Sequence, residues 1–578
     1  MKRIFPYCAA AIILAAALLV PGLTQAARTG TNLPAITPDR TDIIDPLILR
    51  VQKVLRKIGL YKGPLDGLVG PKTLKAVHAY QKIRGRKPSG RITQKLADQL
   101  ETEDKVDALL NRLKKAKATS IDAALQALLN QDTTRELLGD TGKTEIADPT
   151  RDTATCFKTP SPSCLLTEAT ESSKAIFKPE MRDWALGELL VAQAKLGLAK
   201  EAMGTVQRIG DPRLIMVALR NIAQAQASEG RDDEAARAAK IIPDLIRRAE
   251  AFAAISKIQA VRSNDAAVKS ITELLLLVDA VSDPLKKAAL FGKGAVIQNH
   301  TGNAPGARKT LARAEALANS LTDPHRRETA LGYVATAWAE IGAADRALDV
   351  LKEMGRKNER TPVLVSTAIA QAKAGDAFLA IETAQEIDSL RYKSVVLARI
   401  AAAQEASKKG GDALETLDQA RDAASEIKKP FARDYAISRI ALTQSWIGRV
   451  RKNADELDAA AAFADTIKNK RLRAETLWTI AGQLRRLSGA DRAKVINGMA
   501  DDAADEIKSQ LSQVWMFGDI SLVHLKHGET AAAWKVWQRG LKIAEGIHNA
   551  WGRTRALGKL AATLIRLDKT LIKLDKTK

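Results

Sequence analysis

The chain contains few aromatic residues and almost no cysteine. Phe, Trp and Tyr make up 4% of its 578 residues although 46% are hydrophobic, so most of the apolar content is aliphatic or alanine. This composition favours helices packed through small side chains over a β-sandwich. Three cysteines exclude both a disulfide-dense scaffold and a zinc protein held by many cysteines.

The chain also lacks the motifs of common catalytic and metal centres. Neither His-Glu-x-x-His nor Gly-x-Ser-x-Gly occurs. Gly142-Lys143-Thr144 invites comparison with a phosphate-binding loop, but Leu137 replaces its first glycine and helical sequence precedes it. His524 and His527 share a helix face without a third ligand nearby in the sequence. We therefore expect no enzyme activity, no metal site and no cofactor.

Long apolar runs are missing except near the N-terminus. Residues 1–3 are basic, residues 9–20 are apolar, and residues 24–26 provide small side chains before a cleavage point. This layout predicts a signal peptide over residues 1–26, whose apolar run is short for a bilayer span. A retained membrane anchor is the alternative. We expect a periplasmic protein without an integral membrane segment after signal removal, with residues 27–44 as a linker.

Cys156 and Cys164 remain after signal removal and enclose a Pro-rich segment. In an oxidising compartment this pair predicts a disulfide. Two reactive thiols are the alternative, but the spacing is not Cys-x-x-Cys. The loop lies in a region, residues 101–170, that we interpret as a helical linker with amphipathic helices at about 105–115 and 121–138.

Residues 45–100 have the pattern of a small basic three-helix bundle. A first helix carries apolar side chains from Leu49 to Ile58, and a Gly63–Gly67 turn follows. A second helix begins after Gly70-Pro71, and a third covers about Thr93–Leu100.

These residues resemble the small peptidoglycan-binding domain that is often attached to cell-wall hydrolases. The resemblance rests on Val51, Gln52, Leu55, Gly59, Tyr61, Gly63, Asp66, Gly67, Gly70, Thr73, Ala76, Tyr80, Gln81, Gly85, Gly90, Thr93 and Leu96. It implies a three-helix bundle that binds cell-wall glycopeptide. The candidate ligand contacts are Tyr61, Asp66, Thr73, Tyr80, Gln81 and Arg84. Partly buried packing is the alternative for both tyrosines, and turn stabilisation is the alternative for Asp66.

The charge of this segment agrees with such a ligand. The whole chain carries a formal +23, and residues 45–100 contain thirteen Lys/Arg against three Asp/Glu. A sugar–peptide polymer with free carboxylates favours a basic surface, whereas a merely solvated basic face is the alternative. The remaining array is close to charge balance, so we expect no nucleic-acid partner.

From about residue 171 to 570 the sequence becomes periodic. Gly is followed five positions later by Ala at Gly197/Ala202, Gly230/Ala235, Gly302/Ala307, Gly342/Ala347, Gly375/Ala380 and Gly528/Ala533. Gly permits a turn between antiparallel helices, and Ala permits their close approach. Asp-Pro pairs at 211–212, 283–284 and 323–324 open further helices. Units of 33 to 40 residues resemble tetratricopeptide repeats and predict about ten helix pairs.

The sequence thus predicts an all-α protein, a three-helix bundle followed by an extended tetratricopeptide-like α-solenoid and a duplicated basic tail at 571–578. Our first hypothesis is an exported cell-wall scaffold that docks on peptidoglycan and binds a protein or peptide on its repeats. The alternatives are an accessory or catalytic component of peptidoglycan turnover, similar to the superhelix of lytic transglycosylases, and a self-associating structural spacer.

Overall fold

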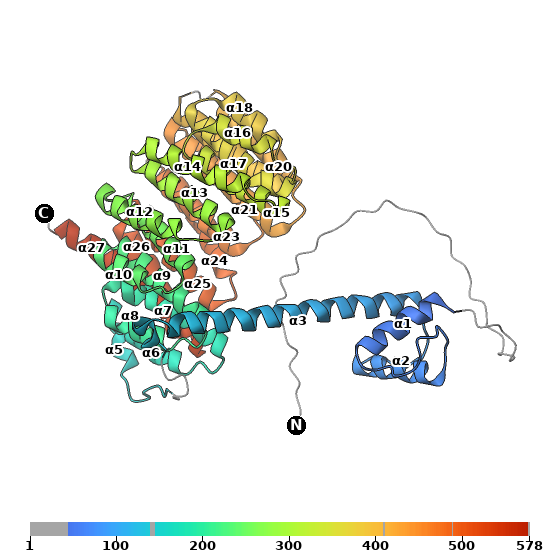
Figure 1. The fold of residues 1–578 in the computed structure, drawn as a ribbon. Coiled ribbons are helices and arrows are strands. Elements are labelled where there is room, and N and C mark those ends of the chain that lie inside the picture. The colour runs from blue at the N-terminus through green and yellow to red at the C-terminus, as the bar shows by residue number, and fades with distance from the viewer. Residues whose placement is uncertain (1–43, 139–144, 409–410, 488, 576–578) are drawn as a thin grey trace. The chain divides into compact units, whose positions relative to one another are not determined.

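A computed structural model of the chain describes residues 44–138, 145–408, 411–487 and 489–575. The expected signal peptide, the linker up to residue 43, the Gly142–Thr144 segment and the last three residues of the expected tail lie outside these ranges. The described residues form 27 helices and no strand, which confirms the all-α fold (Figure 1). The chain divides into two compact units, with the division between Ala116 and Lys117. None of the described helices has the length and apolar character of a membrane span.

The first unit contains α1 (Pro46–Lys57), α2 (Pro71–Ile83) and the first part of α3 (Gln94–Leu129). Its core is formed by aliphatic side chains, such as Val51, Leu55 and Leu100, together with Tyr61 and Tyr80. The predicted three helices are therefore present. The third does not end near Leu100, and the two separate helices expected at 105–115 and 121–138 are wrong. Because no Gly or Pro interrupts Gln94–Leu129, the helix continues without a break.

The second unit begins within α3 and continues through α4 (Asp132–Arg135), α5 (Thr153–Lys158) and α6 (Pro162–Lys174). Helix pairs then follow. The first helices of the pairs are α7 (Pro179–Leu196), α9 (Pro212–Ser228), α11 (Leu245–Gln259), α13 (Pro284–His300), α15 (Pro324–Glu340), α17 (Lys357–Ala374), α19 (Leu390–Ala406), α21 (Pro430–Arg451), α23 (Lys470–Arg485), α25 (Gln510–Lys526) and α27 (Ala550–Asp575). The second helices are α8 (Ala199–Gln207), α10 (Asp232–Lys240), α12 (Asn264–Asp279), α14 (Ala304–Asn319), α16 (Ala344–Lys352), α18 (Ala377–Gln385), α20 (Gly411–Ser425), α22 (Ala454–Asp465), α24 (Ala490–Asp505) and α26 (Thr530–Glu545).

The Gly-x4-Ala signature marks the turns inside the pairs, as predicted. All six glycines have positive φ, between 77° and 90°, a conformation that is costly for side chains with a Cβ. All six alanines five positions later are completely buried. The three Asp-Pro pairs also start helices as predicted, since Asp211, Asp283 and Asp323 each accept a hydrogen bond of 3.0 Å from a backbone N–H in the first turn.

Carboxylates additionally connect one pair to the next. Asp183 in α7 accepts hydrogen bonds from the backbone N–H groups of Gly210 and Asp211 at 3.0 and 2.9 Å. Glu328 in α15 and Asp434 in α21 bind the backbone before α17 and α23 in the same way. Each of these acids satisfies N–H groups that the start of a helix leaves without an intrahelical partner.

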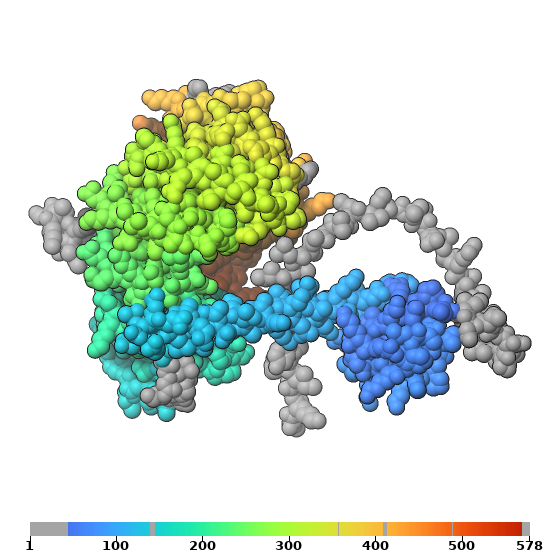
Figure 2. Space-filling model, in the orientation of Figure 1, coloured from blue at the N-terminus to red at the C-terminus, as the bar shows by residue number. Residues whose placement is uncertain are grey.

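The first helices of successive pairs pack directly on one another, whereas the second helices pack mainly on first helices. Elements that pack side by side occupy the shorter, inner circumference of a curved array, so the first helices form its inner layer. We call them the inner helices and the others the outer helices. Figure 2 shows one face of this array, with the colour passing from green to yellow and orange as successive pairs stack.

The two ends of the array meet. The last inner helix, α27, packs against the first inner helix, α7. It also packs against α6, and this contact is as extensive as the contact between the two helices of a pair. Thus α6, which precedes the first inner helix, provides the outer partner that α27 lacks (Figure 1). The predicted α-solenoid is confirmed, and its described helices close into a ring of eleven inner helices. This closure was not predicted. Helix α27 also continues through Asp575, so residues 571–575 of the expected tail are helical.

Candidate functional site

A buried glutamine organises the N-terminal unit. Gln52 of α1 is completely buried, and its amide donates a hydrogen bond to Asp66 Oδ1 at 2.7 Å. The hydroxyls of Tyr61 and Thr73, both 3.2 Å from the same nitrogen, share its N–H groups. Its carbonyl accepts the Gly67 N–H at 2.9 Å. The hydrogen bond from Gln52 and that from a backbone N–H lower the pKa of Asp66, so its carboxylate is charged at neutral pH. Three predicted site residues therefore hold the loop after α1 in one conformation.

Tyr80 and Arg84 meet the N-terminal part of α3. The Tyr80 ring is 2% exposed, and its hydroxyl donates to Glu103 Oε2 at 2.6 Å. Burial, followed by this hydrogen bond, raises the pKa of Tyr80 to about 12. The guanidinium of Arg84 forms an ion pair of 2.8 Å with the same Glu103. These two side chains join α2 to α3.

Gln81 stabilises the second loop of the unit. Its carbonyl accepts hydrogen bonds from the backbone N–H groups of Ser89 and Gly90 at 2.8 and 3.3 Å, while its amide donates to the Ser89 hydroxyl at 3.1 Å. The six candidate residues thus have internal partners, and the side chains of Tyr61, Thr73, Tyr80 and Gln81 are buried. Their direct contact with a ligand remains a prediction, whereas their hydrogen bonds to the loops are present in the structure.

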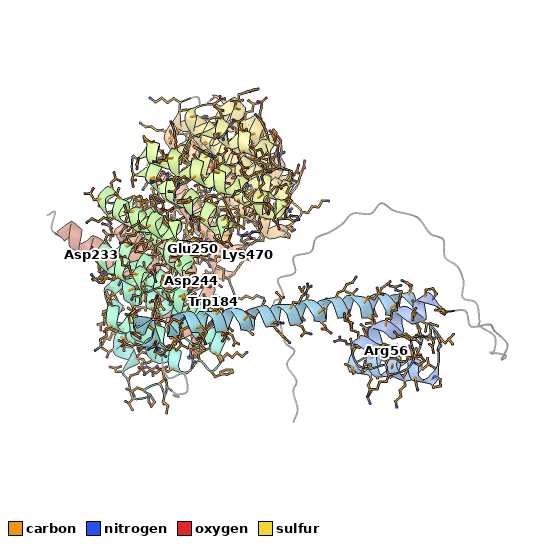
Figure 3. The ribbon with its side chains drawn as sticks, viewed as in Figure 1. Arg56, Trp184, Asp233, Asp244, Glu250 and Lys470 are labelled. Carbon is orange, nitrogen blue, oxygen red and sulfur yellow. A yellow bond between two sulfur atoms is a disulfide. The ribbon has the colours of Figure 1, made fainter. Side chains whose placement is uncertain are left out.

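The loop that Gln52 holds presents a different set of side chains to solvent. Lys62, Leu65, Leu68, Val69 and Lys72 are all exposed, and we call these five residues the loop patch. Arg56, labelled in Figure 3, also holds the loop by donating a hydrogen bond to the Gly63 carbonyl. Exposed apolar side chains beside cations on a rigid loop are typical of a contact surface. Sequence reasoning missed this patch because its members have no distinctive spacing.

The basic charge of the unit is divided between two environments. Arg50, Lys57, Arg84 and Arg86 form ion pairs with acids of α3 such as Glu101 and Glu103. No ion pair involves Lys62 or Lys72 within residues 45–116, all of which the structure describes. The acidic N-terminal part of α3 therefore neutralises one part of the unit, and the cations of the loop patch remain available.

A second candidate surface lies on the inner layer of the ring. Four neighbouring inner helices, α9, α11, α13 and α15, line a hollow of about 560 Å³, which we call the inner hollow. Its wall combines small apolar side chains with charged ones, among them Arg220, Glu250 and Lys257. Figure 3 labels Glu250 on α11. This volume is within the range of small-ligand sites, roughly 300 to 1,000 Å³.

A cluster of indole rings marks the place where the ring closes. Arg555 of α27 forms two hydrogen bonds of 2.7 Å with Glu188 of α7. Its guanidinium carbon lies 4.4, 4.5 and 5.2 Å from the ring centroids of Trp184, Trp551 and Trp515. We call these five residues the closure cluster. Trp184, labelled in Figure 3, is 55% exposed. No local pattern predicts the cluster because Glu188 and Arg555 are 367 residues apart.

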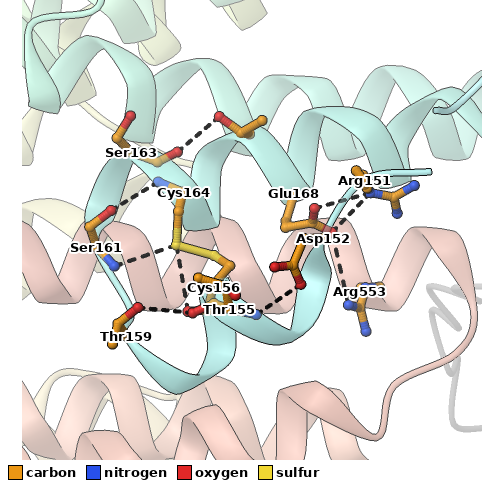
Figure 4. Close-up of a disulfide and its surroundings, with 11 residues drawn as sticks. Arg151, Asp152, Thr155, Cys156, Thr159, Ser161, Ser163, Cys164, Glu168 and Arg553 are labelled. Atoms are coloured by element: carbon orange, nitrogen blue, oxygen red, sulfur yellow. Dashed lines mark hydrogen bonds and ion pairs between the residues drawn. A yellow bond between two sulfur atoms is a disulfide. The ribbon is translucent and has the colours of Figure 1, made fainter. Parts of the chain in front are cut away.

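The predicted pair Cys156 and Cys164 is a disulfide with an S–S distance of 2.03 Å, and it joins α5 to α6 (Figure 4). Beside it, Arg151 bonds Glu168 at 3.0 Å, and Arg553 of α27 lies over the Phe157 ring at 5.1 Å. The disulfide therefore stabilises the hairpin that supplies the outer partner of α27.

The two histidines that share a helix face, His524 and His527, have side-chain partners within the second unit. His524 is hydrogen-bonded to Glu529 at 2.5 Å, and His527 contacts Arg486. Burial and the nearby Arg486 lower the pKa of His527. Within the described parts of the chain, no three His, Cys, Asp or Glu side chains come together as a metal site.

Comparison with known proteins identifies one part of the chain. Residues 45–100 match the family described as "Putative peptidoglycan binding domain", so the chain carries a peptidoglycan-binding domain followed by helical repeats. No curated protein matches the chain.

Two solved structures show a weak likeness. The crystal structure of Ton1535 from Thermococcus onnurineus is 16% identical and covers 55% of this chain and 98% of its own, with a TM-score of 0.27. A circular tandem repeat protein with a novel repeat topology is 12% identical and covers 92% of this chain and 98% of its own, with a TM-score of 0.14.

Proposed function

We propose that this chain is an exported, non-enzymatic scaffold of the cell wall. Residues 45–100 dock on peptidoglycan, and the inner surface of the helical ring receives a protein or peptide. The match of residues 45–100 to a peptidoglycan-binding family carries this proposal. The disulfide between Cys156 and Cys164 agrees with export because such bonds persist in oxidising compartments.

The loop patch is the surface that we assign to docking. The buried hydrogen bonds of Gln52 hold its backbone in place, so little conformational entropy is lost on binding. Leu65, Leu68 and Val69 offer apolar contact area, and Lys62 and Lys72 attract the carboxylates of the polymer. The buried Tyr61, Asp66 and Thr73 then act by holding the patch, while Arg84 remains partly exposed at the other end of α2.

Cosedimentation with purified cell-wall sacculi tests docking. The double variant Lys62→Glu/Lys72→Glu should pellet at least about tenfold less efficiently at low salt, and added salt should weaken pelleting of the unchanged protein. The variant Arg308→Glu/Lys309→Glu is the matched control, because it makes the same charge change on the exposed face of α14. Equal pelleting of all three proteins would refute docking through the loop patch. Release of soluble sugar fragments from the sacculi would refute the non-enzymatic assignment.

A further inference from the structure

The wall of the inner hollow contains more basic than acidic side chains. Arg220 of α9, Lys257 of α11 and Lys286 of α13 line it, and none of them has an ion pair with any residue that the structure describes. A fourth cation of the wall, Lys293, forms an ion pair with Glu250, with 3.8 Å between Nζ and Oε1. Glu340 is the other acid of the wall. The hollow therefore holds more cations than it can neutralise internally.

One of these cations has an unused hydrogen-bond donor. The Nε–H of Arg220 is buried and has no partner among the described residues. A buried donor without a partner is energetically unfavourable, and the side chain that carries it lines the hollow. Lys257 of the neighbouring helix lines the same hollow, so its wall offers cations on two adjacent helices.

The remainder of the wall suits a short peptide. Ala253, Ala254, Ala289 and Val296 provide apolar area, and Tyr333 lines the hollow while half exposed. Lys286 in the first turn of α13 and Lys293 in its middle both line the hollow. The separation of cations along α13 favours a ligand with more than one carboxylate.

We propose that the inner hollow binds the carboxylate-bearing peptide stems of peptidoglycan. The inference rests on the proposed function, since the same chain carries a domain of a peptidoglycan-binding family, and it names the occupant of the ring. The loop patch and the inner hollow then contact two parts of one polymer. Carboxylates of the stem pair with Arg220 and Lys257, and its short side chains pack on the alanines of α11 and α13.

Calorimetric titration with soluble disaccharide–peptide fragments, released from sacculi by a muramidase, tests this assignment. The full chain with Arg220→Glu/Lys257→Glu should bind the fragments at least about tenfold more weakly than the unchanged protein. Arg308→Glu/Lys309→Glu should bind like the unchanged protein. The neutral variant Lys257→Gln should show a smaller loss, and circular dichroism verifies that each variant is folded. Fragments whose carboxylates have been amidated should bind the unchanged protein weakly.

The loop-patch variant separates this inference from the docking proposal. Lys62→Glu/Lys72→Glu should pellet less efficiently with sacculi but retain fragment binding through the inner hollow. If fragment binding is lost in the loop-patch variant and kept in Arg220→Glu/Lys257→Glu, the inner hollow is not the fragment site, although docking is supported. Binding of an acidic protein-derived peptide without binding of the fragments would likewise overturn the assignment to peptidoglycan.

Discussion

Tyr80 illustrates how one side chain can match a binding motif and serve the core. The sequence allows either contact with sugar or packing for this residue, because both uses favour a tyrosine on an amphipathic helix. Only the position of α3 decides between these two uses. Glu103, which accepts the hydrogen bond from the Tyr80 hydroxyl, is on α3 and lies 23 residues further along the chain. The same holds for Gln52 on α1, because the four acceptor atoms within reach of its two amide N–H groups come from the following loop and from α2.

The titration of Tyr80 follows from its environment. The unfolded chain releases a tyrosine proton near pH 10, whereas the folded unit retains this proton up to about pH 12. Because the pKa is higher in the folded state, the stabilisation is fully present below pH 10 and is lost as the pH rises through 12. Ultraviolet titration should therefore show one tyrosine ionising near pH 12. This step should disappear in Tyr80→Phe, and its persistence there would contradict the assignment.

At the scale of helices, two turns of the array have a lysine with positive φ, Lys408 after α19 and Lys452 after α21. The φ of Lys452 is 56°, in the left-handed region where six other turns of the array have glycine. We expect Lys452→Gly to stabilise the ring by about 1 kcal/mol because glycine adopts this conformation at little cost. Gly342→Ala is the opposite change. An added Cβ there meets nothing within 4 Å, so its φ of 88° alone should cost about 1 kcal/mol. Urea unfolding midpoints should move in opposite directions, and shifts of the same sign would contradict this account.

Local signals explain which helices were predictable. The Gly-x4-Ala turns and the Asp-Pro starts depend on residues only a few positions apart, and the structure has them where the sequence placed them. The break expected inside α3 had no glycine or proline to cause it, and the helix is continuous. The loop patch and the inner hollow could not be predicted, because each depends on which side chains neighbouring helices leave exposed.

At the scale of the whole second unit, the repeat pattern predicts stacking but not where it stops. A solenoid with ordinary ends needs capping helices to cover its terminal apolar faces. Here α6 and α7 cover α27, so the first elements of the array complete the last pair. This contact requires the curvature that accumulates over all eleven inner helices. The sequence of a single repeat therefore does not predict it.

The closure cluster should control whether the ring stays shut. Arg555→Ala removes both hydrogen bonds to Glu188 and the contacts with three indole rings, and it leaves a half-buried carboxylate without its partner. Removing one partner of a largely desolvated pair costs about 3 kcal/mol. Hydrogen exchange should therefore accelerate in α6, α7 and α27 while α15 and α17 keep their protection, and the radius of gyration should increase. Arg313→Ala is the matched control, because Arg313 also pairs with an acid, Asp279, and lies over an aromatic ring, Phe291, but within the array. Equal exchange profiles of the two variants would show that the closure cluster has no special part in holding the ends together.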